Sequence, residues 1–135
     1  MRHDAFCAIM TRAMRKEVDP MSVCALCPRH CHARRTAAGG AGFCRLPETM
    51  LIGRIAPHLW EEPPISGSRG TGAIFFSGCT LRCAYCQNGD LSHRNQGRSF
   101  TPRELADSLR RLVELGMQSI SFITGTPYVP QILET

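Results

Sequence analysis

The sequence predicts an α/β fold that follows a cysteine-rich, loop-dominated segment, and two observations support this prediction. In the second half of the chain, two apolar runs flank a helical pattern, which is the order of a right-handed strand–helix–strand unit. In the first half, four of the eight cysteines lie between residues 24 and 44. That stretch has too little apolar mass to fold by burial alone, so we expect a bound metal to hold it together.

The strands of the unit are predicted from continuous apolar runs. Residues 73–76 are flanked by glycines, as expected of a strand buried on both faces of a parallel sheet. Residues 119–123 predict the second strand, and residues 124–127 predict a turn into another helix. A further short apolar run, residues 50–55, predicts a strand ahead of the unit.

The helix between the two strands has a marked start and end. Thr101 is the expected N-cap, Pro102 takes the first helical position and Glu104 completes a capping box. Gly116 supplies the carboxyl-terminal stop. The apolar positions expected on one face are Leu105, Leu109, Leu112 and Val113.

A loop with three cysteines directly follows the first buried strand. Cys79, Cys83 and Cys86 have the spacing Cys-x3-Cys-x2-Cys. Three thiolates can bind three corners of an iron–sulfur cubane, whereas an electron-transfer ferredoxin would supply four. The incomplete set would leave one iron open, as catalytic metal sites do. The alternatives are a zinc site that takes a fourth ligand such as His93, and three incidental reduced thiols.

The loop resembles the defining motif of radical S-adenosylmethionine (SAM) enzymes, because an aromatic residue, Tyr85, stands just before the third cysteine. The sequence Cys86-Gln87-Asn88 is similar to the one found at this place in the activating-enzyme branch, the relatives of the pyruvate formate-lyase activating enzyme. Matches to uncharacterised homologues of that activase run in order along the chain, at Cys24–Cys31, Gly42–Cys44, Trp60–Gly67, Ile74–Cys79 and Tyr128–Ile132.

This resemblance implies a [4Fe-4S] cluster on Cys79, Cys83 and Cys86, with SAM bound at the open iron. The chemistry it implies is reductive cleavage of SAM to a 5′-deoxyadenosyl radical. The positions implied to contact SAM are Tyr85, Asn88, Thr124, Gly125 and Thr126.

The chain departs from the family pattern in two respects. The turn at residues 124–127 lacks the carboxylate of the family's Gly-Gly-Glu turn, so backbone carbonyls or threonine hydroxyls would have to receive the amino group of SAM. The family barrel has about six strand–helix units, and this chain offers two strands and the start of a second helix. We therefore expect the beginning of a partial (βα)6 barrel, in an amino-terminal fragment.

The amino-terminal cysteines form a separate set of four. Cys24, Cys27, Cys31 and Cys44 have the spacing Cys-x2-Cys-x3-Cys-x12-Cys. A structural zinc site and a second iron–sulfur cluster both accept four thiolates, and the spacing is compatible with either. Reduced thiols, or a redox-active pair at Cys24 and Cys27, are the remaining alternatives.

Composition limits the classes of binding partner and the cellular compartment that we expect for this protein. The net charge of +5 is mild and no basic cluster is interleaved with aromatic residues, so nucleic-acid binding is not expected. No stretch approaches the roughly 18 apolar residues of a membrane helix, and no secretory signal is evident. We expect a cytoplasmic protein whose cysteines are reduced.

Four segments are predicted along the chain. Residues 1–20 form a tail, residues 21–47 the cysteine-rich metal-binding segment, residues 48–70 a lead-in, and residues 71–135 a truncated radical SAM core. The leading hypothesis is an activating-type radical SAM enzyme. By analogy it would act on a protein substrate of the glycyl-radical type and take electrons from a flavodoxin or ferredoxin. The rival hypotheses are a catalytically inactive, metal-stabilised binding module and a two-cluster electron carrier.

Overall fold

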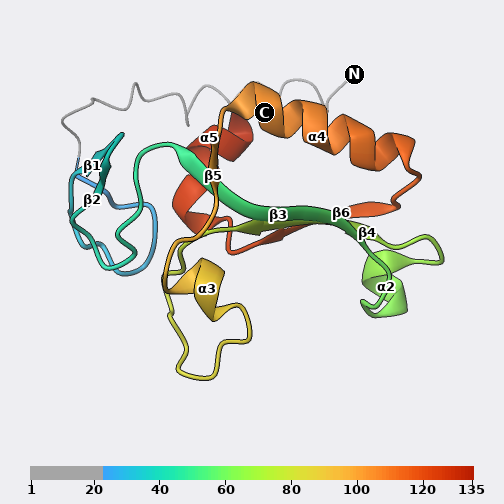
Figure 1. The fold of residues 1–135 in the computed structure, drawn as a ribbon, viewed down its shortest axis with the longest axis horizontal. Helices are drawn as coiled ribbons and strands as arrows, with labels where there is room; N and C mark the ends of the chain where they lie inside the picture. The colour runs from blue at the N-terminus through green and yellow to red at the C-terminus, as the bar shows by residue number, and fades with distance from the viewer. Residues whose placement is uncertain (1–22) are drawn as a thin grey trace, which may run out of the picture.

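A four-stranded mixed sheet forms the centre of the computed structural model, which describes residues 23–135 (Figure 1). The tail predicted for residues 1–20 lies outside the described residues. The strand order is β5-β3-β4-β6. The strands are β3 (Met50–His58), β4 (Thr71–Phe76), β5 (Arg98–Phe100) and β6 (Ser119–Ile123). The helices are α2 (Pro63–Ser66), α3 (Gly89–Ser92), α4 (Pro102–Glu114) and α5 (Val129–Leu133), with a 3-10 turn, η1 (Thr126–Tyr128).

The predicted strand–helix–strand unit is confirmed as β4, α4 and β6. β4 and β6 pair in parallel, with Phe75 opposite Ile123, and α4 lies along one face of the sheet (Figure 1). β4 is buried along almost its whole length, because it runs through the middle of the sheet. The carboxyl ends of β4 and β6 therefore meet at one edge of the sheet, where α/β folds place their chemistry.

The sheet is wider than the two strands of the predicted core. The strand predicted at residues 50–55 is confirmed and extends to His58. It pairs antiparallel with β4, from Ile52 to His58. β5 pairs antiparallel with the other edge of β3. β5 was not predicted, since its three residues, Arg98 to Phe100, contain a single apolar side chain. The sheet is consequently mixed: β4 pairs in parallel with β6, whereas the pairs that β3 makes are antiparallel.

The predicted capping box of α4 is present. The Glu104 backbone N–H donates to Thr101 Oγ1 at 3.2 Å, and the Thr101 backbone N–H donates to Glu104 Oε2 at 2.8 Å. That second N–H also lowers the pKa of the Glu104 carboxyl group. Leu105 and Leu112 are buried against the sheet, as predicted, but Val113 is 63% exposed and does not belong to the buried face.

Replacing Thr101 by alanine should lower the free energy of unfolding by about 1 kcal/mol, because an N-cap acceptor is lost. Urea denaturation followed by circular dichroism measures this change. The control is Thr101→Ser, which keeps the hydroxyl and should leave the midpoint nearly unchanged. Equal midpoints for the alanine variant and the parent chain would contradict the role of Thr101.

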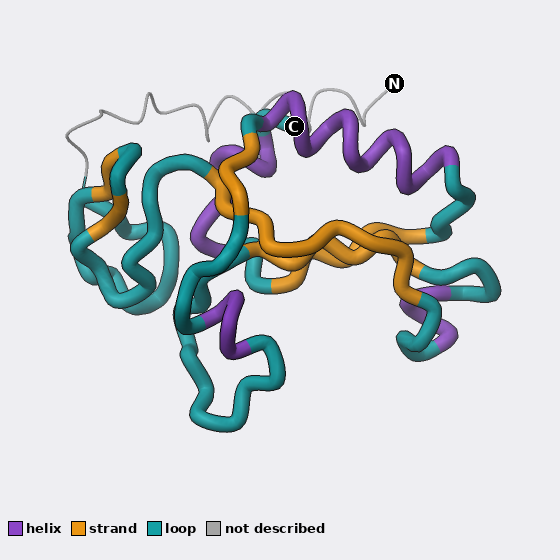
Figure 2. Tube along the Cα trace, in the orientation of Figure 1, coloured by secondary structure: helices purple, strands orange, loops and turns teal. Residues whose placement is uncertain are grey.

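The cysteine-rich segment lies beside the sheet and consists mainly of loops (Figure 2). Its regular structure is one short antiparallel pair, β1 (Arg35–Thr36) and β2 (Gly39–Gly40). No residue between 23 and 45 is buried. The apolar core begins after it and contains Leu46, Met50, Ile52, Ile74, Phe76, Phe100, Leu105, Leu112 and Tyr128. This segment is therefore shaped by forces other than apolar burial.

Candidate metal centre

The three-cysteine loop begins where β4 ends, and its base is held by backbone hydrogen bonds. The Ser77 N–H donates to the Leu51 carbonyl at 2.8 Å, and the Gly78 N–H donates to the Leu91 carbonyl at 2.7 Å. The Ser77 side chain is fully buried and its hydroxyl donates to the Gln96 carbonyl. The backbone just before Cys79 is thus fixed between β3 and the segment that follows the loop.

Gly78 makes the sharp exit from β4 possible. Its φ of +78° lies in the region that only glycine occupies without strain. A Cβ atom at this position would lie 2.4 Å from Cδ2 of Leu46, a fully buried core residue. The direction in which the cysteine loop leaves the sheet therefore depends on close packing against the core.

Tyr128, in the turn after β6, also holds the backbone of Ser77 in place. Its side chain is fully buried, and its hydroxyl donates to the Ser77 carbonyl at 3.1 Å. Its ring lies 5.6 Å from the Phe76 ring, centroid to centroid, and 5.3 Å from the guanidinium carbon of Arg35. Burial raises the pKa of Tyr128 far above that of a free tyrosine.

This raised pKa predicts an alkaline loss of stability. The unfolded chain releases the Tyr128 proton above about pH 10 while the folded chain keeps it, so the free energy of unfolding falls by about 1.4 kcal/mol per pH unit there. Below pH 10 the group should contribute no pH dependence. Urea midpoints between pH 9 and 11 measure the slope, and Tyr128→Phe should remove it. The same alkaline slope in both chains would contradict the prediction.

Two of the three sulfur atoms in the loop already accept hydrogen bonds. Cys79 Sγ accepts from the Leu81 backbone N–H at 3.4 Å, and Cys86 Sγ accepts from the Ser92 hydroxyl at 3.3 Å. Between them, the Cys86 N–H donates to the Cys83 carbonyl at 3.2 Å and closes a turn. Hydrogen bonds to sulfur are one means by which proteins tune thiolate-bound clusters.

The three thiols share a loop but do not surround a common point. Among residues 23–135, no three side chains of the types His, Cys, Asp and Glu lie close enough together to hold a metal ion. The donors nevertheless fit a cubane in type and number, since the thiols of Cys79, Cys83 and Cys86 are all free. The middle of the loop is not packed in the core, because Leu81 is 70% and Tyr85 92% exposed.

The turn predicted to contact SAM lies next to the base of the cysteine loop. Thr124 has a φ of +60°, and its hydroxyl donates to the Phe76 carbonyl at 2.9 Å, which ties the ends of β6 and β4 together. Gly125 is buried and Thr126 is exposed. On the loop side, Asn88 precedes α3, and its carbonyl accepts from the Leu91 N–H at 3.0 Å.

His93, the alternative zinc ligand, is not brought together with the three cysteines. Its carbonyl accepts from Nη2 of Arg82 at 3.1 Å, and its Nε2 is buried without a hydrogen-bond partner. Arg82 also donates through Nη1 to the Phe43 carbonyl at 3.4 Å. Sequence reasoning missed Arg82 as a bridge between the cysteine loop and the amino-terminal segment, because its partners are backbone carbonyls, which no residue pattern marks.

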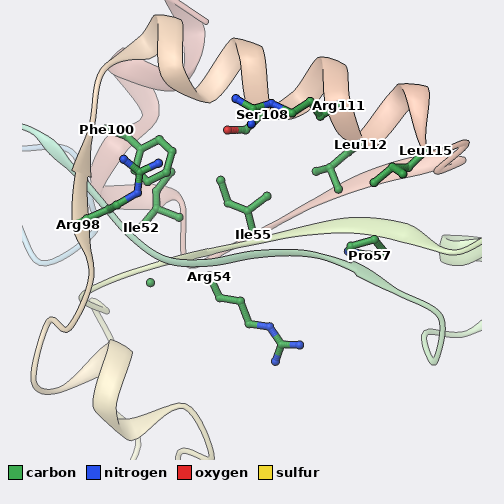
Figure 3. A pocket seen from close by; sticks show the side chains of 11 residues that line it. Ile52, Arg54, Ile55, Pro57, Arg98, Phe100, Ser108, Arg111, Leu112 and Leu115 are labelled. Atoms are coloured by element: carbon green, nitrogen blue, oxygen red, sulfur yellow. The ribbon is translucent and has the colours of Figure 1, made fainter.

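A separate cavity of about 570 Å³ lies between α4 and the sheet (Figure 3). Ile52, Ile55 and Leu112 line the space between helix and strands, whereas Arg54 points away from α4 (Figure 3). No Cys, His, Asp or Glu side chain of the described residues lines this cavity. It contains none of the predicted site residues, so the cysteine loop remains the candidate metal centre.

Comparison with known proteins gives a match in the part of the chain that contains the cysteine loop. The model of the radical SAM superfamily matches residues 73–134, a span that contains most of β4 together with the cysteine loop, α4 and β6. Residues 73–134 belong to the radical SAM superfamily. The matched span includes Cys79, Cys83 and Cys86.

Three relatives show how far the similarity reaches. An uncharacterized protein of Methanocaldococcus jannaschii is 30% identical over 121 residues, which cover 83% of this chain and 34% of the relative. The pyruvate formate-lyase-activating enzyme of Clostridium pasteurianum is 38% identical over 63 residues, 46% of this chain and 26% of the enzyme. The 7-carboxy-7-deazaguanine synthase of Methanothermobacter thermautotrophicus is 33% identical over 66 residues, 45% of this chain and 27% of the synthase.

The chain thus spans between about a quarter and a third of the length of the curated relatives it matches. No solved structure matches it. Within residues 23–135, none of the helices has the length and apolar character that crossing a membrane requires.

Proposed function

We propose that this chain binds a [4Fe-4S] cluster on Cys79, Cys83 and Cys86 and takes part in the reductive cleavage of SAM. The observation that carries the proposal is the superfamily match over residues 73–134, with its three-cysteine loop at the carboxyl end of β4. When bound, a cluster held by three thiolates supplies an open iron for SAM and the electron that cleaves it to a 5′-deoxyadenosyl radical.

The residues at the base of the loop would hold the first ligand in place. Tyr128 and Leu51 fix the Ser77 backbone from two sides, and Gly78 turns the chain toward Cys79. At the far end of the loop, the Ser92 hydroxyl donates to Cys86 Sγ from a buried position. Both outer ligands therefore leave well-packed structure, which supports a preorganised site.

The turn after β6 would receive the amino group of SAM without a carboxylate. The Thr124 hydroxyl donates its proton to the Phe76 carbonyl, so its remaining lone pairs can only accept hydrogen bonds. An ammonium group donates hydrogen bonds and requires acceptors. Gly125 and Thr126 would contribute backbone carbonyls. From the cysteine loop, the exposed ring of Tyr85 would offer a flat apolar face, and Asn88 an amide, for the rest of the molecule.

The similarity to the pyruvate formate-lyase-activating enzyme supports a glycyl-radical-type protein as the substrate. We propose that an electron donor such as a flavodoxin or ferredoxin reduces the cluster, and that the protein works in the cytoplasm. Residues 71–135 would form the first part of a (βα)6 barrel core. The matched enzyme shares 63 aligned residues with this chain, so these assignments extend from a portion of that enzyme.

Anaerobic reconstitution with iron and sulfide tests the proposal. The chain should take up a visible-absorbing cluster, and with dithionite and SAM it should release 5′-deoxyadenosine and methionine. Omission of dithionite is the control and should stop product formation. Uptake of zinc without a reducible cluster would contradict the proposal and favour a catalytically inactive, metal-stabilised module. A reversible cluster that never yields 5′-deoxyadenosine would favour an electron carrier.

A further inference from the structure

The four amino-terminal cysteines line one small pocket, although they are spread over 21 residues of the chain. The cysteines on its wall are Cys24, Cys27, Cys31 and Cys44. Leu26 and Phe43 add apolar surface, and Thr80 of the cysteine loop closes one side. The cavity holds about 10 Å³, which is room for about one water-sized sphere.

Local backbone structure brings these cysteines to the same pocket. The Cys24 N–H donates to the Ala33 carbonyl at 2.9 Å, which folds the segment back on itself. The His30 N–H donates to the Cys27 carbonyl at 3.0 Å and closes a turn between the second and third cysteines. A Cβ atom on Gly42 would lie 2.9 Å from Cys31 Sγ, so the glycine gives this sulfur the space it needs.

Burial cannot account for the shape of this segment. None of residues 23–45 is buried, and two of its large apolar side chains, Leu26 and Phe43, are each 39% exposed. The four thiols form no disulfide. A segment of this size without a core requires another cross-link, and a metal held by thiolates is the one that its composition offers.

The pocket is joined to the cysteine loop by cationic side chains. The guanidinium carbon of Arg29 lies 3.5 Å from the centroid of the Phe43 ring, and Arg29 also donates to the Thr80 carbonyl. Arg82 approaches the same ring at 5.6 Å. Asn95 Nδ2 donates to the Cys44 carbonyl at 2.9 Å, so one cysteine of the pocket is tied to the segment after the loop.

We propose that Cys24, Cys27, Cys31 and Cys44 form a tetrathiolate site for one Zn²⁺ ion, which holds the amino-terminal segment against the base of the cysteine loop. Four thiolates are a standard ligand set of structural zinc. A single ion is smaller than a four-iron cubane, and the pocket between these side chains is small, about 10 Å³. The four thiols line the pocket but do not yet lie close enough together to hold an ion, so binding would draw the sulfur atoms inward and release their protons.

Zinc titration of the full chain, purified anaerobically and stripped of metal, tests the site. The chain should retain one Zn²⁺ after removal of excess, and Cys27→Ser and Cys44→Ser should each lose it. Cys83→Ala should still retain it, because that thiol belongs to the other set. The [4Fe-4S] proposal is tested by the iron bound at Cys79, Cys83 and Cys86, and the zinc proposal is tested by retained zinc. Either proposal can therefore fail without the other.

Cobalt provides the second readout, because a serine variant that fails to fold would also lose zinc. Co²⁺ should show the intense absorption of tetrahedral thiolate ligation in the parent chain. Cys44→His should keep one Co²⁺ with a shifted spectrum, since three thiolates and one imidazole also form a structural zinc site. The proposal would be overturned if the parent chain retained no zinc, or if Cys27→Ser retained as much as the parent. It would also be overturned by a Cys44→His spectrum identical to that of the parent, or by an iron–sulfur cluster on these four cysteines.

Discussion

Replacing Cys83 by alanine should abolish cluster binding in the reconstituted chain. A cluster held by three thiolates is lost when one of them is removed, because two cysteines leave half of the irons without a protein ligand. Bound iron should fall from about four atoms per chain to near zero, together with the visible absorption of the cluster. Formation of 5′-deoxyadenosine should stop.

Two controls separate this effect from general damage. Cys7→Ala removes a thiol outside both cysteine sets and should leave the iron content unchanged. Cys44→Ser removes a proposed zinc ligand and should leave reducible iron in place. Full iron uptake by Cys83→Ala would contradict the assignment of that thiol as a ligand. If Cys44→Ser lost its iron and Cys83→Ala did not, the cluster would have to be assigned to the amino-terminal cysteines.

Gly78→Ala should be among the most destabilising single substitutions in the chain. Two costs add at this position. A φ of +78° strains any residue with a Cβ atom by about 1–2 kcal/mol. A contact of 2.4 Å with the buried Leu46 side chain adds about 1–3 kcal/mol of overpacking. We expect a loss of about 2–5 kcal/mol in the free energy of unfolding, measured by urea denaturation.

Two other glycines separate the two costs. Gly116 has a φ of +85° with nothing within 4 Å of the place where a Cβ atom would lie, so Gly116→Ala should cost only the strain, about 1–2 kcal/mol. Gly89 begins α3 at an ordinary φ and is equally open, so Gly89→Ala should be neutral or stabilising by up to about 1 kcal/mol. Equal losses at Gly78 and Gly116 would show that packing against Leu46 contributes nothing.

The elements that could be predicted well are those with local signals in the sequence. β4 is an unbroken apolar run, and α4 carries its capping box and stop glycine within or beside its own residues. β5 has no such signal, because it is short and largely polar, and its place is fixed by pairing with β3. Val113 was assigned to the buried face by periodicity alone, but it lies beyond the edge of the surface that α4 buries.

The three-cysteine motif could be predicted from spacing, but the structure around it could not. The hydrogen bond from Tyr128 to the Ser77 carbonyl and the one from Arg29 to the Thr80 carbonyl each join residues 51 positions apart. In each bond the acceptor is a backbone carbonyl, which every residue possesses, so no spacing or residue type predicts these bonds. Such contacts arise only when the fold brings distant segments together.

The two cysteine sets therefore have different relations to the fold. Cys79, Cys83 and Cys86 project from the edge of a packed sheet, on a loop whose two ends are buried and whose middle is exposed. Cys24, Cys27, Cys31 and Cys44 line a pocket in a segment without a core. We expect the first set to keep an open coordination position and the second to be closed, as catalytic and structural metal sites generally differ.

Electron paramagnetic resonance of the reduced, reconstituted chain, recorded with and without SAM, tests whether Cys79, Cys83 and Cys86 hold a cluster with an open iron. If Cys79, Cys83 and Cys86 hold a [4Fe-4S] cluster with one open iron, the amino and carboxylate groups of SAM can bind that iron, and the signal should change shape when SAM is added. Cys83→Ala should give no such signal. A cluster signal that SAM leaves unchanged, or one that persists in Cys83→Ala, would contradict the account.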